Sequence, residues 1–185
     1  MLNLCFRHNK LKSMEVNGYK IEPGANLAGA VLKKANLAGA NLKGADLSGS
    51  NLAGANLKGA DLSEANISLA SFHSADLSGA KLNNLKNTTR ANLSHTFLIE
   101  ADLSHSVLQG VYLFDSDLSR ANLANSDLRW ASLENSILRG ANLSNARFEG
   151  ANLVEANLAK ASISGTIFGD ANLQWAMMPD GTTHD

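Results

Sequence analysis

A leucine or another large apolar residue recurs at every fifth position along most of this chain, and that spacing limits the folds open to it. A small residue, usually alanine, stands two positions before each one. A period of five matches neither the 3.6-residue turn of a helix nor the alternation of a strand. It fits a chain that turns a right angle once per unit, so that four units close one square coil. In the first run the large residues are Leu27, Leu32, Leu37, Leu42, Leu47, Leu52, Leu57, Leu62, Ile67, Phe72, Leu77 and Leu82.

Stacking such coils would bury both the large and the small side chains in a narrow core. Each large residue would then lie on the one a full coil further along, with coils about 4.8 Å apart as in a β-sheet. We therefore predict an all-β solenoid, a single stacked array of about 7–8 coils. The residues predicted for its structural core are Leu27, Leu47, Ile67, Leu93, Leu113, Leu133 and Leu153.

The repeat also divides the chain. Residues 1–24 are predicted to be an N-terminal extension and cap, of which 1–13 are expected to be poorly ordered and 14–22 to form a short hairpin around Asn17-Gly18. Residues 25–82 form the first array and 91–176 a second one continuous with it, followed by a tail at 177–185. Because Leu82 and Leu93 are separated by two units plus one residue, 83–90 is predicted to be a register-shifting loop or bulge.

Charge and composition exclude several function classes. Lys plus Arg number 16 and Asp plus Glu 17, which is not the basic balance of a sequence-independent nucleic-acid binder. The single Cys5 excludes an internal disulfide framework. No apolar run reaches the length of a membrane span, and residues 1–13 do not read as a signal peptide. We expect no nucleic-acid or membrane partner and a cytoplasmic location.

No arrangement of residues predicts catalysis. The serines and glycines recur at repeat positions, outside any nucleophile or phosphate-loop motif. If Leu93 stacks on Phe72, then His73 and His95 lie near each other, with Asp115 one coil beyond. Such a trio could hold a metal or form a polar ladder, and the ladder is the preferred interpretation. We predict that the protein is not an enzyme and has no catalytic residues, cofactor or metal.

Outward positions change character after residue 90. In the first array they are mostly small or polar, whereas the second carries a cluster of outward apolar residues: Phe97, Ile99, Val107, Tyr112, Phe114 and Trp130. An exposed cluster of this kind is typical of a partner-binding patch. The alternative is that the 83–90 loop or the N-terminal segment covers it. The sequence leaves both open.

The unit Ala-Asn/Asp-Leu-x-x, as at 25–27, 45–47, 101–103 and 141–143, resembles the A(D/N)LXX motif of the pentapeptide-repeat proteins. The resemblance covers about 150 residues and implies a right-handed quadrilateral parallel β-helix. The C-terminal tail is similar to those of cyanobacterial members, among them a regulator of heterocyst differentiation.

The function expected from these observations is a non-catalytic protein–protein interaction or scaffold module, regulatory in role, with another protein as its partner. The family resemblance adds two alternatives: a DNA-mimicking inhibitor of gyrase, and a regulator of cell differentiation. A homodimer formed through an end cap is a further expectation.

Overall fold

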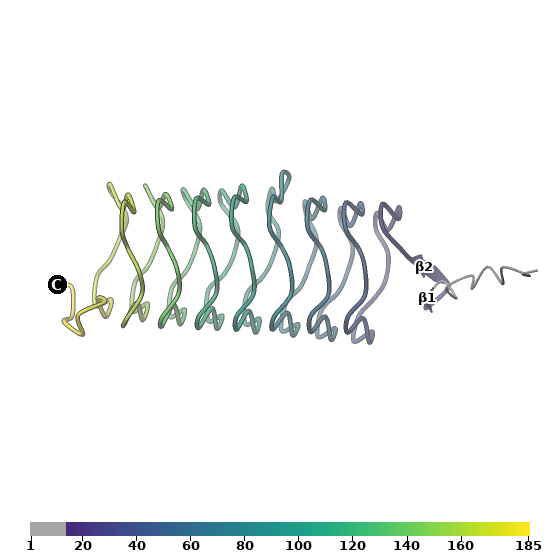
Figure 1. Ribbon diagram of the computed structural model, residues 1–185, viewed down its shortest axis with the longest axis horizontal. Helices are drawn as coiled ribbons and strands as arrows, with labels where there is room; N and C mark the ends of the chain where they lie inside the picture. The colour runs from purple at the N-terminus through teal and green to yellow at the C-terminus, as the bar shows by residue number, and fades with distance from the viewer. Residues whose placement is uncertain (1–13) are drawn as a thin grey trace, which may run out of the picture.

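Residues 14–185 are described by the computed structural model, and from residue 25 onward they wind into a right-handed, four-sided β-helix, as predicted (Figure 1). The described chain advances along one axis, from the β1–β2 hairpin at one end of the rod to the C-terminus at the other. The only regular strands in the described part are β1 (Met14–Val16) and β2 (Tyr19–Ile21), which pair antiparallel. None of the described residues forms a helix with the length and apolarity needed to cross a bilayer.

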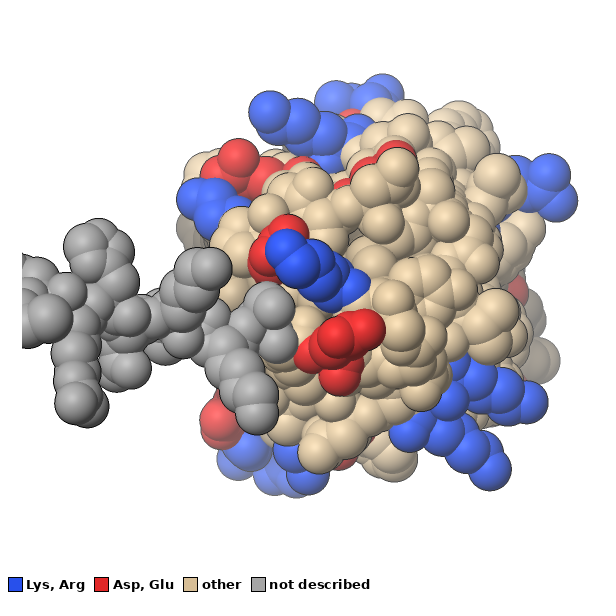
Figure 2. Space-filling view, turned by 90° about the vertical axis from the view of Figure 1, so that its right-hand side faces the viewer, with Lys and Arg blue, Asp and Glu red and all other residues tan. Residues whose placement is uncertain are grey.

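Four walls arise because the residue before each large core residue pairs, in parallel, with its counterpart one coil further on. We name each wall after a residue in it. The Tyr112 wall contains the pairs Asn92–Tyr112 and Tyr112–Ser132, and the Phe97 wall follows it in each coil with Phe97–Asp117. The Asp102 wall and the Val107 wall complete the circuit. Seen from its N-terminal end, the rod carries Lys and Arg side chains that project from its rim (Figure 2).

Each corner between walls is a tight turn. The N–H of Ala30 donates to the carbonyl of Leu27 at 3.0 Å, which closes a four-residue turn whose third residue, Gly29, has φ of +67°. A type II turn requires positive φ at that position, which favours glycine. Asn26 supports the turn, because its Oδ1 accepts the N–H of Ala28 at 3.2 Å. Asn41 and Asp46 make the same contact to the amide two residues on, so the Asn/Asp residues of the repeat stabilise corners.

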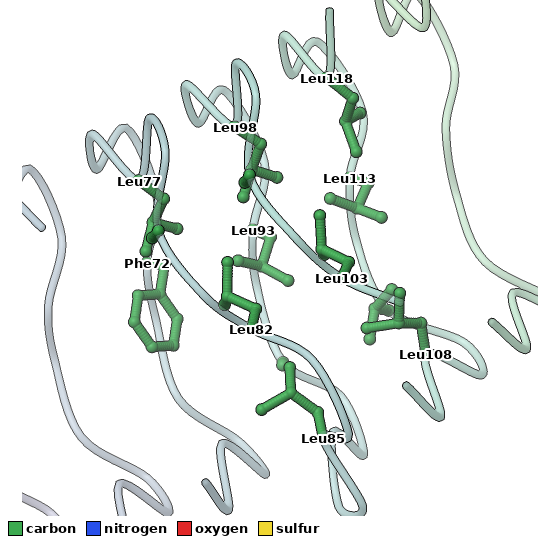
Figure 3. Close-up of a cluster of buried hydrophobic side chains, with 14 of the residues drawn as sticks. Phe72, Leu77, Leu82, Leu85, Leu93, Leu98, Leu103, Leu108, Leu113 and Leu118 are labelled. Atoms are coloured by element: carbon green, nitrogen blue, oxygen red, sulfur yellow. The ribbon is translucent and has the colours of Figure 1, made fainter. Parts of the chain in front are cut away.

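The core is a stack of large side chains (Figure 3). All seven residues predicted for it are buried, with exposures of 2% or less. Their amides bond along the axis: the N–H of Leu27 donates to the carbonyl of Asp46 at 2.7 Å, and the N–H of Asp46 donates back to Ala25 at 2.9 Å. Each coil is thus held by apolar burial and by hydrogen bonds to both neighbouring coils.

The predicted break is an insertion of one residue. Pairing shifts from a 20-residue step, as in Asp46–Asn66, to a 21-residue step at Asn66–Asn87. Lys86 is the extra residue and is exposed. Leu85 turns inward and is fully buried, and Thr88 occupies a core position with 3% exposure. The step lies in the corner between the Asp102 and Val107 walls, so stacking continues without a domain boundary.

The two ends of the rod are covered differently. At the N-terminal end the β1–β2 hairpin packs on the first coil, where Ile21 is buried and the N–H of Val31 donates to the Tyr19 hydroxyl at 3.3 Å. At the other end the tail folds back, and the N–H of Trp175 donates to His184 O at 2.7 Å. Ile163 and Phe168, on the two walls that the tail does not pair with, are only half-buried. The predictions for residues 1–13 lie outside the described residues.

Candidate functional site

The six outward apolar residues do not form one patch, because they lie on three walls and the corners beside them. Tyr112 lies on the Tyr112 wall and Phe114 at the corner that follows it, whereas Phe97 lies on the adjacent Phe97 wall and Ile99 at the corner that follows that wall. Val107 lies half a coil from Phe97, on the opposite wall. A single flat recognition surface is therefore excluded for the complete set. The six residues are near one another along the chain, but position within the 20-residue coil decides the wall on which each one lies.

Three of the six flank one corner, and we call them the aromatic corner: Phe97, Tyr112 and Phe114. Ile99 lies at the next corner, between the Phe97 and Asp102 walls. Phe97 is 51% and Tyr112 41% exposed, while Ile99 and Phe114 are half-buried. Equivalent wall positions in the first array are held by smaller residues, such as Asn56 before Phe97. An apolar surface that wraps one corner over two coils is available for contact with another molecule.

The corner continues into a short ladder of rings. The ring centroids of His73 and His95 are 5.0 Å apart, and those of His95 and Phe114 5.4 Å, both edge to face. Ser94 Oγ lies 3.0 Å from His73 Nδ1, and Asp115 Oδ2 lies 3.7 Å from His95 Nε2. His73, His95 and Asp115 thus meet as the sequence suggested. Within residues 14–185, however, no group of three or more His, Cys, Asp or Glu side chains is arranged to hold a metal. The contacts that His73, His95 and Asp115 make are ring-to-ring and polar contacts along the rod axis, as in a polar ladder.

The stretch 83–90 does not cover the aromatic corner. Its Leu85 and Thr88 are buried in the rod, and Thr88 Oγ1 donates to the carbonyl of Val107 at 2.6 Å. This stretch is part of the wall on the far side of the coil. The alternative in which 83–90 shields the cluster is therefore wrong. The alternative in which residues 1–13 shield it concerns residues outside the described ones.

The Val107 wall carries a charged network. Arg129 donates to both carboxylate oxygens of Asp127, from Nε at 2.8 Å and from a terminal nitrogen at 2.6 Å, and Gln109 Nε2 adds a third contact at 2.6 Å. The hydrogen bonds from Arg129, reinforced by Gln109 and opposed by partial burial, lower the pKa of Asp127 to about 2. The arrangement is self-contained, since donors and acceptors within the wall satisfy one another.

Trp130 stands at the corner that follows this wall and is 66% exposed. Its indole lies over Gly150 in the next coil, where a Cβ would come within 2.3 Å of the ring. Gly150 therefore makes room for the ring. Trp130 presents its outer face to solvent at the corner where the Val107 wall meets the Tyr112 wall.

A basic cavity, which the sequence prediction did not include, opens at the corner between the Phe97 and Asp102 walls. Its volume is about 360 Å³, and it is lined by Ser119, Arg120, Arg139, Gly140 and Lys160. These residues come from three successive coils. The detectable signal is their spacing: Arg120, Arg139 and Lys160 are 19 and 21 residues apart, which places them at one corner of a 20-residue coil.

Comparison with known proteins identifies the repeat. The model of a family described as pentapeptide repeats matches residues 23–49, 45–84, 89–123, 113–140 and 141–176. A comparison with curated proteins found no matching sequence.

Several solved structures are similar. QnrB1, a plasmid-mediated fluoroquinolone resistance protein, is 24% identical over 76% of this chain and 73% of its own, with a TM-score of 0.70. HetL, a pentapeptide repeat protein involved in heterocyst differentiation regulation in the cyanobacterium Nostoc sp. strain PCC 7120, is 29% identical over 89% of this chain and 92% of its own, with a TM-score of 0.36. A pentapeptide repeat protein of the Arabidopsis thaliana thylakoid lumen is 32% identical over 51% and 66%, with a TM-score of 0.47. The likeness to QnrB1 shows the β-helix fold.

Proposed function

The chain belongs to the pentapeptide-repeat family, and on that premise we propose that it is a non-catalytic module that binds another protein, in a regulatory role, through the aromatic corner. The observation that carries the proposal is the change of the outer surface after Lys86. Phe97 and Tyr112 replace small polar residues on two adjacent walls and remain exposed. Aromatic residues on a rigid support are typical centres of protein interfaces, because they bury a large area at a small entropic cost.

The rod suits such a role because the backbone that carries the exposed aromatic residues is anchored by buried neighbours. Phe97 and Tyr112 each precede a fully buried leucine, Leu98 and Leu113, whose amides bond to the next coil at 2.7 and 2.8 Å. The backbone beneath the aromatic corner is therefore fixed. Binding to a pre-organised surface costs less ordering entropy than binding to a loop.

The test is capture of a partner from extracts of the source organism with the immobilised full chain. The variant Tyr112→Ser/Phe114→Ser should lose a protein that the unaltered chain retains. Its matched control is Val31→Ser/Leu69→Ser, which removes two exposed apolar residues from the first array. The proposal predicts that the control still retains that protein. A second variant, Phe97→Ser, checks the other side of the corner.

Thermal denaturation of all variants separates binding from folding. Loss of binding with an unchanged unfolding temperature supports the proposal. A large drop in unfolding temperature for Tyr112→Ser/Phe114→Ser would instead show that these side chains serve the fold. Equal retention by every variant would reject the aromatic corner as the contact surface.

Inhibition of gyrase by DNA mimicry is the less favoured role, because such mimicry needs a continuous acidic surface. Here acids on the early coils are paired with cations: Lys43 with Glu64 at 3.1 Å, and Lys58 with Asp76 at 3.1 Å. Inhibition of DNA supercoiling by the purified chain, with relaxed plasmid and gyrase, would reverse this ranking.

We also propose that two copies of the chain can form a homodimer through the C-terminal end of the rod. Phe168 at the C-terminal end is half-buried and stacks on Phe148, with ring centroids 5.6 Å apart. A second copy could cover it. Sedimentation velocity of the unaltered chain and of Phe168→Ser tests this contact, because a monomer in both cases would reject it.

A further inference from the structure

We infer that the basic cavity at the corner between the Phe97 and Asp102 walls binds a phosphoryl group. The cavity lies at the other edge of the Phe97 wall from the aromatic corner, because its lining residues follow Asp117, Ile137 and Asn157 of that wall. Its assignment to a phosphorylated side chain of a protein rests on the proposed function. Binding of the phosphoryl group itself does not.

Three cations meet here with little compensation. Arg120 is held by Glu100, whose Oε1 accepts from Nε at 2.9 Å and lies 2.9 Å from a terminal nitrogen. Arg139 and Lys160 have no acidic partner among residues 14–185. Like charges on neighbouring coils about 4.8 Å apart repel one another. An anion placed between them would remove that repulsion.

The acids along this corner are engaged by other groups. Asp117 Oδ1 accepts the N–H of Ser119 at 2.9 Å. Glu100 orients Arg120 at one end of the corner. At the other end, Asp180 Oδ1 accepts from the amide and the hydroxyl of Thr182, at 3.0 and 2.7 Å. These contacts lower the pKa of Asp180 and keep its carboxylate in the tail. The excess charge of Arg139 and Lys160 thus faces the cavity.

Gly140 forms the part of the cavity between the flanking cations. Arg120, Gly140 and Lys160 occupy the same corner position in three successive coils. A side chain at residue 140 would project into the space between Arg120 and Lys160, where a Cβ would lie 3.6 Å from Arg120 Cγ. Glycine at this position leaves room for a ligand atom group between two cations.

Charge and shape favour a phosphoryl group over a carboxylate. A phosphoryl monoester carries about −1.5 to −2 charges at neutral pH and three acceptor oxygens. That charge balances the positive charges of Arg139 and Lys160, whereas the single negative charge of a carboxylate would balance only one of them. The guanidinium of Arg139 can contact two phosphoryl oxygens at once, and the hydroxyl of Ser119 offers one more donor. The cavity is also larger than a bare phosphate requires, so an attached organic group fits.

The experiment is a titration of the full, isotope-labelled chain at low ionic strength, followed by the amide NMR signals of Gly140 and Ser119. The probes are N-acetyl-O-phosphoserine N-methylamide, the same compound without the phosphate, and inorganic phosphate. The phosphorylated compound should shift both signals, and the compound without phosphate should not. The variant Arg139→Gln/Lys160→Gln should weaken binding about 10-fold or more.

Lys33→Gln/Lys34→Gln is the matched control, because it removes the same charge from the first array and should leave binding unchanged. Tighter binding of phosphoserine than of inorganic phosphate supports a protein source. Equal binding of the two supports the phosphoryl site and assigns it to a free phosphate compound. Absence of any shift, or equal weakening by both double variants, would overturn the inference. None of these outcomes depends on the aromatic corner, whose capture experiment stands separately.

Discussion

The hydroxyl of Ser106 lies 3.0 Å from the amide nitrogen of Leu85 and bridges the coil step at which one residue is inserted. Ser106 Oγ accepts that N–H and donates to the carbonyl of Leu82 at 2.7 Å. In regular corners the equivalent amide and carbonyl bond directly, as Ala80 does to Leu77 at 3.0 Å. The serine therefore satisfies two buried backbone groups that the insertion has separated.

Replacing Ser106 should destabilise the rod more than replacing an ordinary core serine. Ser106→Ala leaves the buried N–H of Leu85 and the carbonyl of Leu82 without this partner, at a cost of about 1–3 kcal/mol. Ser126→Ala is the control, because Ser126 Oγ donates to a Leu123 carbonyl that already accepts the Ser126 N–H. Urea denaturation of both variants measures the difference. Equal destabilisation would show that the bridge is not needed.

A second prediction concerns acid stability. Because Arg129 lowers the pKa of Asp127 to about 2 from an ordinary value of 3.8, the folded state favours the ionised carboxylate. This contribution is fully present above pH 4 and is lost as the pH falls toward 2. Asp127→Asn should therefore flatten the dependence of unfolding free energy on pH in that window. Urea denaturation between pH 2 and pH 7 tests this. An unchanged slope would contradict it.

Corner conformation leads to a third prediction. Leu69 is 59% exposed and has φ of +58°, a region that costs a non-glycine residue about 1–2 kcal/mol. Leu69→Gly should stabilise the chain by about 0.5–1 kcal/mol, after the greater unfolded-state entropy of glycine is subtracted. Gly49→Leu, at the same corner one coil earlier, should destabilise it, because its φ of +64° is costly for a non-glycine residue; a Cβ there meets no other atom, so the backbone conformation alone is tested. Urea denaturation should show changes of opposite sign in the unfolding free energy for Leu69→Gly and Gly49→Leu. Changes of the same sign would contradict the prediction.

The Trp130 ring provides a fourth prediction. Gly150→Ala would put a Cβ within 2.3 Å of the indole, so the ring must move away from the coil beneath it. In a Trp175→Phe background, which leaves one tryptophan, the fluorescence maximum should shift to longer wavelength. Gly110→Ala, two coils before Gly150 on the same corner, is the control, because Gly110 has a similar φ, +62° against +69°, and an open Cβ position. It should leave the spectrum unchanged.

The fold was predictable because the five-residue units place a large apolar residue and a small residue at the same two positions. The five-residue spacing identified the buried residues, the corners and the place where the register changes. It could not say which residue of 83–90 is extra. Leu85, Lys86 and Thr88 could each point inward or outward, depending on where the 21st residue of the coil is inserted. The structure buries Leu85 and Thr88, because both are less polar than Lys86.

The candidate site was harder to predict than the fold. Phe97 and Val107 are close in sequence, yet half a coil separates them and puts them on opposite walls. Conversely, Arg120 and Lys160 are far apart in sequence, yet they line one cavity. All four residues lie after Lys86, so their positions within the regular 20-residue coil of the second array are enough to assign them to walls and corners.

The one-residue insertion at Lys86 also shows how freely the length of such a rod can vary. Coils before and after it contact only their immediate neighbours, so the added residue is absorbed at a single corner and nothing further along is disturbed. Deleting a whole 20-residue coil from the second array should therefore shorten the molecule by about 4.8 Å and bring the surfaces on either side closer together by that amount. The number of coils therefore sets the distance between surfaces at different positions along the rod.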